Sequence, residues 1–154
     1  MIISQSFTRP ADTTAYASGD VMNGSAVTVP ISFTLSQLMI NPCVTGASIV
    51  SSNQTGTFTG ILHLFTTSFT TAADNAAFAP TDSDVSNYYL GAVSIGAAWN
   101  AFTANKVSTT LLTNKLPLSK NMNLDSAIVY GVLVATSAYT PISGEVLTIN
   151  LFLA

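Results

Sequence analysis

The feature that most constrains the fold of this chain is a strict alternation of apolar and polar residues, clearest over residues 26–35. The apolar side chains fall on every second position: Val27, Val29, Ile31, Phe33 and Leu35. Because successive side chains of a strand point to opposite faces, this spacing predicts a β-strand with one face on a core. Pro30 cannot donate to a strand ladder, so we expect this strand at a sheet edge.

Other segments show related patterns, some with apolar residues on both faces, and we expect strands at residues 2–7, 47–51, 57–66, 87–95, 107–112, 127–135 and 146–153. Short strands separated by Gly, Pro, Asn and Asp are typical of an antiparallel sandwich or a jelly roll. The length of 154 residues suits one domain. The sequence therefore predicts a single all-β domain over residues 1–154, an antiparallel β-sandwich or jelly-roll-like fold of about eight strands.

Three further segments are predicted less regularly. Residues 1–25 are expected to form an extended N-terminal arm, which includes the weaker strand candidate 2–7. Residues 67–86 read as a long loop, and loops of that length are usually functional or interaction surfaces. Residues 97–104 fit either one helical turn or an irregular crossing.

Charge is scarce, which excludes several classes of partner. Only 7% of the residues are charged, with four Lys or Arg against seven Asp or Glu and a net charge of −3. Without a basic cluster, the chain lacks the phosphate-neutralising groups that nucleic-acid binding requires. The longest nearly unbroken apolar stretch, 127–135, is much shorter than the roughly 20 residues of a membrane-spanning helix. We therefore expect neither nucleic acid nor membrane as a partner.

The N-terminus lacks the basic and apolar regions of a secretory signal, so synthesis and retention in a thiol-reducing cytoplasm are expected. Cys43 is the only cysteine, which excludes a disulfide within the chain, and it is expected to be a small buried apolar side chain. The lysines Lys106, Lys115 and Lys120 are expected to form a solvated rim rather than an anion site.

Candidate catalytic and metal-binding residues are few. His63 is the only histidine and lies between Leu62 and Leu64 without a Gly-x-Ser-x-Gly elbow in the chain, so a structural or surface role is favoured over a catalytic one. Asp82 and Asp84 fit turn or cap chemistry better than a calcium loop. No phosphate-binding glycine motif is present. We predict no enzymatic activity, no catalytic or metal-binding residues and no cofactor.

A glycosidase site finds little support in the sequence, because it needs a pair of carboxylates and only Glu145 and scattered Asp residues are present. The single tryptophan, Trp99, also offers little aromatic surface for stacking when taken alone.

Several blocks of the sequence resemble a known family. Residues 7–16, FTRPADTTAY, followed by Gly19-Asp20-Val21, are similar to the opening of a family of small virion-associated proteins of tailed bacteriophages. The resemblance continues in family order at residues 64–65, 73–78, 80, 87–91, 131–135, 138–141 and 144–146. It implies a β-sandwich structural protein of the virion, above all one that decorates or cements a capsid. The family supplies no catalytic residues.

The composition supports the same expectation. A chain with 48% hydrophobic and 7% charged residues presents Ser, Thr, Asn and stray apolar groups to solvent, a surface that favours contact with other proteins. We expect a non-enzymatic virion protein, made in the host bacterial cytoplasm, that binds the major capsid protein on the outer capsid surface and reinforces contacts between capsomers. A homo-oligomer is expected, with a trimer favoured.

Three alternatives stay open at this stage. The first is a receptor- or glycan-binding module of a phage head or tail fibre, and the second is a hydrolase on a jelly-roll scaffold. The third is a plain monomer whose hydroxyl-rich surface is hydrated well enough by itself.

The candidate partner contacts lie near the N-terminus and in the long loop. The apolar residues Ile2, Ile3 and Phe7 are candidates because an edge strand can pair with a neighbour. Arg9 and Asp12 fit either a subunit ion pair or a local turn in which Asp12 caps the amides of residues 13–14 and Arg9 lies in solvent. Asp74 and Asn75 fit first a turn or cap and second a partner contact.

Overall fold

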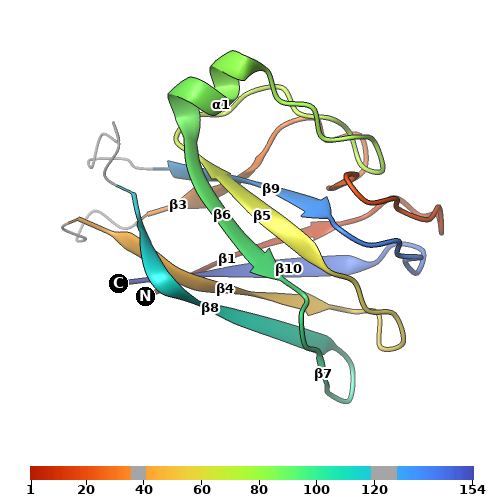
Figure 1. Ribbon diagram of the computed structural model, residues 1–154. Helices are drawn as coiled ribbons and strands as arrows, with labels where there is room; N and C mark the ends of the chain where they lie inside the picture. Colours follow the sequence, from red (N-terminus) through yellow and green to blue (C-terminus); the bar gives the residue numbers. More distant parts are fainter. Residues whose placement is uncertain (36–40, 119–127) are drawn as a thin grey trace.

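Two antiparallel β-sheets pack face to face, with a short helix above one of them (Figure 1). The computed structural model describes residues 1–35, 41–118 and 128–154. The first sheet has the strand order β1 (Ile2–Thr8), β10 (Val146–Leu153), β4 (Cys43–Ser51), β8 (Lys106–Pro117) and β7 (Asn100–Ala101). The second has the order β2 (Val21–Met22), β9 (Ile128–Ala135), β5 (Gly60–Phe65) and β6 (Tyr89–Ile95), with β3 (Ile31–Thr34) also paired to β9.

The strand pairing is nested. If the two-residue strands β2 and β7 are set aside, the first of eight strands pairs with the last (β1 with β10) and the second with the seventh (β3 with β9). The third pairs with the sixth (β4 with β8) and the fourth with the fifth (β5 with β6). This nesting is the connectivity of a jelly roll, and it confirms the predicted all-β antiparallel sandwich.

The core lies between the sheets and comes from alternate residues of the strands. On β10, Leu147, Ile149 and Leu151 are fully buried, and Leu62 and Leu133 of the opposite sheet belong to the same cluster. Each such side chain contributes about 1.5–3 kcal/mol on leaving water. The period-two pattern predicted for residues 146–153 is therefore confirmed, and most of the other expected strands form with shifted ends.

The strand predicted over residues 26–35 is much shorter than its alternation suggests. Only Ile31–Thr34 forms β3, whereas Val29 is 49% exposed and Ala26 adopts a positive φ of 57°. The Asn23 side-chain amide donates to the carbonyl oxygens of Val27 (3.4 Å) and Val29 (3.1 Å). Because a side chain occupies these backbone acceptors, residues 27–29 do not continue the strand.

The prediction of an extended arm over residues 1–25 is wrong. Strand β1 pairs with β10 from Ile2 to Thr8, and Ile3 and Phe7 pack against the core. Farther along, the Tyr16 amide donates to the Tyr139 carbonyl oxygen at 2.8 Å, and β2 pairs with β9. Alternate burial of apolar residues on β1 accounts for its place in the sheet.

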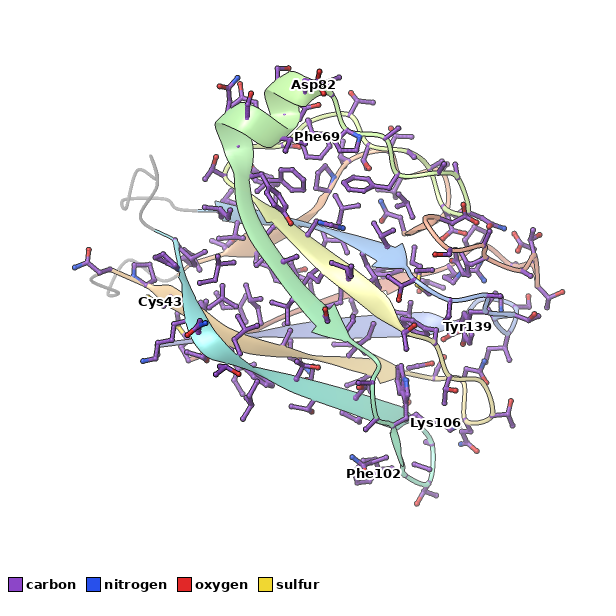
Figure 2. The ribbon with its side chains drawn as sticks, viewed as in Figure 1. Cys43, Phe69, Asp82, Phe102, Lys106 and Tyr139 are labelled. Atoms are coloured by element: carbon purple, nitrogen blue, oxygen red, sulfur yellow. The ribbon has the colours of Figure 1, made fainter. Side chains whose placement is uncertain are left out.

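The predicted loop 67–86 runs over the outer side of the second sheet and leads into helix α1 (Asp82–Tyr88). Phe69 and Phe78 from this loop pack against a second apolar cluster that includes Phe65 of β5, and Figure 2 shows Phe69 beneath the helix. Thr81 and Asp84 form a capping box, which confirms cap chemistry for Asp84. Residues 97–104 form no helical turn and are irregular apart from Asn100–Ala101, which pairs with β8 as β7.

The register between β4 and β8 shifts between Val44 and Gly46, and at Gly46 the two strands lie unusually close together. A Cβ atom at Gly46 would lie 2.3 Å from the Thr110 carbonyl oxygen. We expect Gly46→Ala to destabilise the protein by about 1–3 kcal/mol, because backbone atoms cannot move aside as a side chain can. Urea unfolding measures this, with Thr45→Ala as the control in the same strand. Equal stability of the two variants would contradict the predicted clash.

Candidate functional site

The outer face of the first sheet carries a continuous surface without charged side chains. Strand register places the residues in rows across β1, β10, β4 and β8. The rows are Ile2, Phe152, Gly46 and Leu111; then Ser4, Asn150, Ser48 and Thr109; then Ser6, Thr148, Val50 and Val107. We call these twelve positions the outer sheet face. Its most exposed apolar members are Ile2, at 64%, and Leu111, at 72%.

Polar groups on the outer sheet face bond to one another. The Ser4 hydroxyl donates to Asn150 Oδ1 at 2.6 Å, and Asn150 Nδ2 donates to Ser48 Oγ at 2.9 Å. The hydroxyls of Ser6 and Thr148 lie 2.7 Å apart and share a hydrogen bond. Covering a polar group is costly when that group loses its hydrogen bonds. These hydrogen bonds between neighbouring strands remain when a partner displaces water from the outer sheet face. Covering the face therefore costs little free energy.

Of the apolar candidates on β1, only Ile2 belongs to the outer sheet face. Ile3 and Phe7 point to the other side of the strand and pack against the core. The predicted partner contact of all three stays a prediction, but the side chains of Ile3 and Phe7 lie on the core side of β1. Phe152 and Leu111, which complete the row of Ile2, were not predicted as contacts. Only the register across four strands brings these residues together.

Arg9 and Asp74 form an enclosed ion pair. Arg9 is 2% exposed, and its Nη2 donates to Asp74 Oδ2 at 2.9 Å. Asp74 Oδ1 accepts from the Tyr16 hydroxyl (2.5 Å) and from the Asn23 backbone N–H (2.9 Å). The Arg9 guanidinium also lies over the Tyr16 ring, 4.5 Å from its centroid. The expectation that Arg9 lies in solvent is wrong, and this pair has almost no surface left for a partner.

Asp12 and Asn75 remain close to the surface and support turns. Asp12 Oδ1 accepts from the Thr14 amide at 2.9 Å, which confirms the local turn predicted for residues 12–14. That hydrogen bond lowers the pKa of Asp12 below its ordinary value. Asn75 has a positive φ of 59°, and its backbone N–H donates to the Val21 carbonyl oxygen at 2.8 Å. Asn75 therefore forms part of the turn expected there.

A second buried polar cluster surrounds Glu145, which is fully buried. Its carboxylate accepts from the Ser51 hydroxyl at 2.6 Å and from the Tyr139 hydroxyl at 2.7 Å, and Asn53 Nδ2 donates to the Tyr139 hydroxyl at 2.8 Å. Burial, and then the bond to Glu145, raise the pKa of Tyr139. The sequence did not predict this cluster, because its members lie up to 94 residues apart. Because Glu145, Ser51, Asn53 and Tyr139 are all buried, we assign this cluster a structural role.

His63 lies on the outer side of the second sheet among aromatic rings. Its Nδ1 is 3.2 Å from the Tyr89 hydroxyl, and its ring centroid is 5.1 Å from that of Phe78. Burial lowers the pKa of His63 below its ordinary value. The contacts with the aromatic rings and the Tyr89 hydroxyl agree with a structural role for His63.

Other candidate residues take ordinary places in the fold. Cys43 is half-buried at the start of β4 rather than fully buried as predicted. Lys106 Nζ donates to the Thr55 carbonyl oxygen at 3.1 Å, Lys115 is exposed, and Lys120 lies outside the described residues. Within residues 1–35, 41–118 and 128–154, no cluster of three or more His, Cys, Asp or Glu could hold a metal ion. No helix in those same ranges is long and apolar enough to span a membrane.

Comparisons with known proteins do not assign the chain to a family. No family model matches it, and no curated protein does. A search of solved structures finds a chain in the structure of infectious bursal disease virus Gx strain, with 15% identity and a TM-score of 0.17. The alignment covers 97% of this protein and 41% of that chain, so this protein spans less than half the length of its match. At that TM-score the likeness carries no argument.

The two carboxylates near Arg9 provide a matched pair of substitutions. Asp74→Asn removes the negative charge that lies 2.9 Å from the buried guanidinium, and we expect a loss of about 3–5 kcal/mol of stability. Asp12 lies 3.7 Å from Arg9 with an exposed side chain, so Asp12→Asn should change stability little. Chemical denaturation of both variants tests this. Similar midpoints for the two would show that Asp74 does not hold the Arg9 charge.

His63 predicts how stability changes with pH. The pKa of His63 in the folded state lies below the ordinary 6.5. As the pH falls below about 6.5, His63 is therefore protonated more in the unfolded chain than in the folded protein, which favours unfolding. The histidine's contribution is complete above pH 6.5 and is lost as the pH falls. We expect the free energy of unfolding to decrease from pH 7.5 to 5.5, and His63→Phe to flatten that decrease. A wild-type slope retained in His63→Phe would rule out this source.

Proposed function

We propose that this protein is a non-enzymatic structural protein of a bacteriophage virion that decorates the outer capsid surface. The observation that carries the proposal is the outer sheet face, where twelve positions on four strands hold no charged side chain. The row of Ile2, Phe152 and Leu111 offers apolar area, and the adjoining hydroxyl and amide groups already bond laterally. A major capsid protein is the proposed partner, through which neighbouring capsomers would be held together.

The fold and the resemblance of the sequence blocks support this proposal. Jelly rolls occur in viral capsid proteins, although they also occur in lectins and cupins, so the fold alone does not select a function. Among the sequence blocks, those at residues 7–16, 131–135, 138–141 and 144–146 resemble virion-associated proteins of tailed phages. On a symmetric lattice, modest contacts at each copy add up to strong attachment, so a small uncharged face is sufficient.

We also propose that the protein acts as a homo-oligomer, with a trimer favoured. A cement protein placed where capsomers meet gains from matching the local symmetry, because each subunit then makes the same contact. Sedimentation equilibrium of the purified chain measures the oligomeric state.

The decisive experiment is to quantify the protein in purified particles and to test substitutions on the outer sheet face. A decoration protein should occur in on the order of hundreds of copies per particle, and its removal should lower the temperature at which heads release DNA. Leu111→Asp should weaken binding to heads lacking the protein by at least about tenfold, because it buries an unpaired carboxylate. Ile2→Asp should act in the same way.

Phe102→Asp is the matched control, because Phe102 is 63% exposed but lies at the tip of the β7–β8 hairpin, apart from the outer sheet face (Figure 2). Absence from purified particles would overturn the proposed function. Presence in only tens of copies, with binding to host cells, would favour the receptor-binding alternative. Full binding by both Leu111→Asp and Ile2→Asp would show that another surface makes the contact.

A further inference from the structure

A pocket opens at the end of the sandwich where β6 ends and β5 begins, and none of its lining residues belongs to the outer sheet face. Its volume is about 440 Å³, within the range of small-molecule sites. The walls come from three connections: residues 57–59 before β5, residues 96–99 after β6, and Ser137 after β9. Figure 1 shows these strand ends converging on one side of the molecule.

The chemistry of the walls restricts the ligand. None of the lining residues is ionisable, so a charged ligand would lose hydration without gaining a partner. The lining combines the hydroxyls of Thr57, Thr59 and Ser137 with the indole of Trp99. A neutral molecule with one apolar face and several hydroxyl groups matches both features. Pyranose sugars have this form, because their axial C–H groups can pack on an aromatic ring while their hydroxyls form hydrogen bonds.

Trp99 is held in place before any ligand arrives. Its Nε1 donates to the Phe58 carbonyl oxygen at 2.9 Å, and its ring lies against that of Phe58 with centroids 5.2 Å apart. Phe58 is 2% exposed and packs in turn against Tyr139 at 5.0 Å. The tryptophan that stands alone in the sequence is therefore the outermost ring of a packed series. A fixed ring loses little conformational freedom on binding.

The polar side of the pocket is also ordered. Ser137 Oγ accepts from the Thr59 amide at 3.1 Å, and the Thr136 hydroxyl donates to Thr59 Oγ1 at 2.8 Å. Because a serine hydroxyl both donates and accepts, Ser137 keeps its own proton for a ligand. Gly96, at φ +86°, lets the chain turn tightly beside Phe58, since a Cβ there would lie 2.1 Å from the Phe58 carbonyl oxygen.

From this geometry we infer that the pocket binds a neutral saccharide, stacked on Trp99 and hydrogen-bonded to Thr57 and Ser137. The inference is independent of the proposed capsid attachment, because the pocket and the outer sheet face share no residue. A decoration protein attached by its outer sheet face could therefore carry this site as a second function.

Titration with simple sugars tests the inference directly. Trp99 is the only tryptophan of the chain, so its fluorescence reports on the pocket. The probes are the methyl glycosides of glucose, galactose, mannose and N-acetylglucosamine, with glucuronate and galacturonate as charged counterparts. We expect at least one neutral glycoside to give a saturable change with a dissociation constant on the order of a millimolar, and the charged sugars to bind at least about tenfold more weakly.

Variants that keep the fluorescent reporter sharpen the test. Thr57→Val and Ser137→Ala each remove a hydroxyl and should weaken binding about fivefold. Thr113→Val, an exposed position on β8 outside the pocket, is the matched control and should bind like the wild type. Circular dichroism checks that each variant is folded. No saturable response to any glycoside up to about 100 mM, or unchanged affinity in both pocket variants, would overturn the inference.

Discussion

Pairing between the two ends of the chain is the constraint on which the rest of the structure depends. Strand β1 pairs with β10 in one register from Ile2–Phe152 to Thr8–Val146, and this pair encloses the other three nested pairs. A slip of one residue would turn Ile3 and Phe7 away from the core and turn Ile2 toward it. The same register therefore determines the packing of the interior and the composition of the outer sheet face.

The structure makes a charge-poor chain still poorer in surface charge. Among the four basic and seven acidic residues, Arg9, Asp74 and Glu145 are enclosed in hydrogen-bonded clusters. Tyr16 and Tyr139 stack at 6.3 Å and connect those clusters at one end of the sandwich. Such clusters hold loops in fixed positions and remove three of the charged side chains from the surface.

Sequence patterns predicted the fold well because alternation records burial on a pleated sheet. It located β10 and most of the other strands, and the number of strands indicated a sandwich or jelly roll. It failed over residues 26–30, where the Asn23 side chain takes the backbone acceptors that a strand would use. It also gave no sign that Arg9 would meet Asp74, because that contact joins residues 65 positions apart.

The candidate site was predicted only in part, for the same reason. Ile2 could be named from its place on a hydrophobic edge strand, but its neighbours Phe152 and Leu111 come from other strands and depend on register. The pocket beside Trp99 depends likewise on loops that meet only in the folded chain. Local patterns report which side of a strand is buried, whereas a site requires knowledge of which strands are adjacent.

The closeness of the first and last residues has a practical consequence. The Met1 nitrogen lies 2.7 Å from the Leu153 carbonyl oxygen, and Figure 1 shows N and C side by side. A polypeptide fused to either end would emerge at the same corner, beside Ile2 and Phe152. A bulky fusion there would block access to the apolar row of Ile2, Phe152 and Leu111. A short peptide bridge could instead join the ends, with new termini opened in the β7–β8 hairpin, so that cargo is displayed at the opposite end of the sheet.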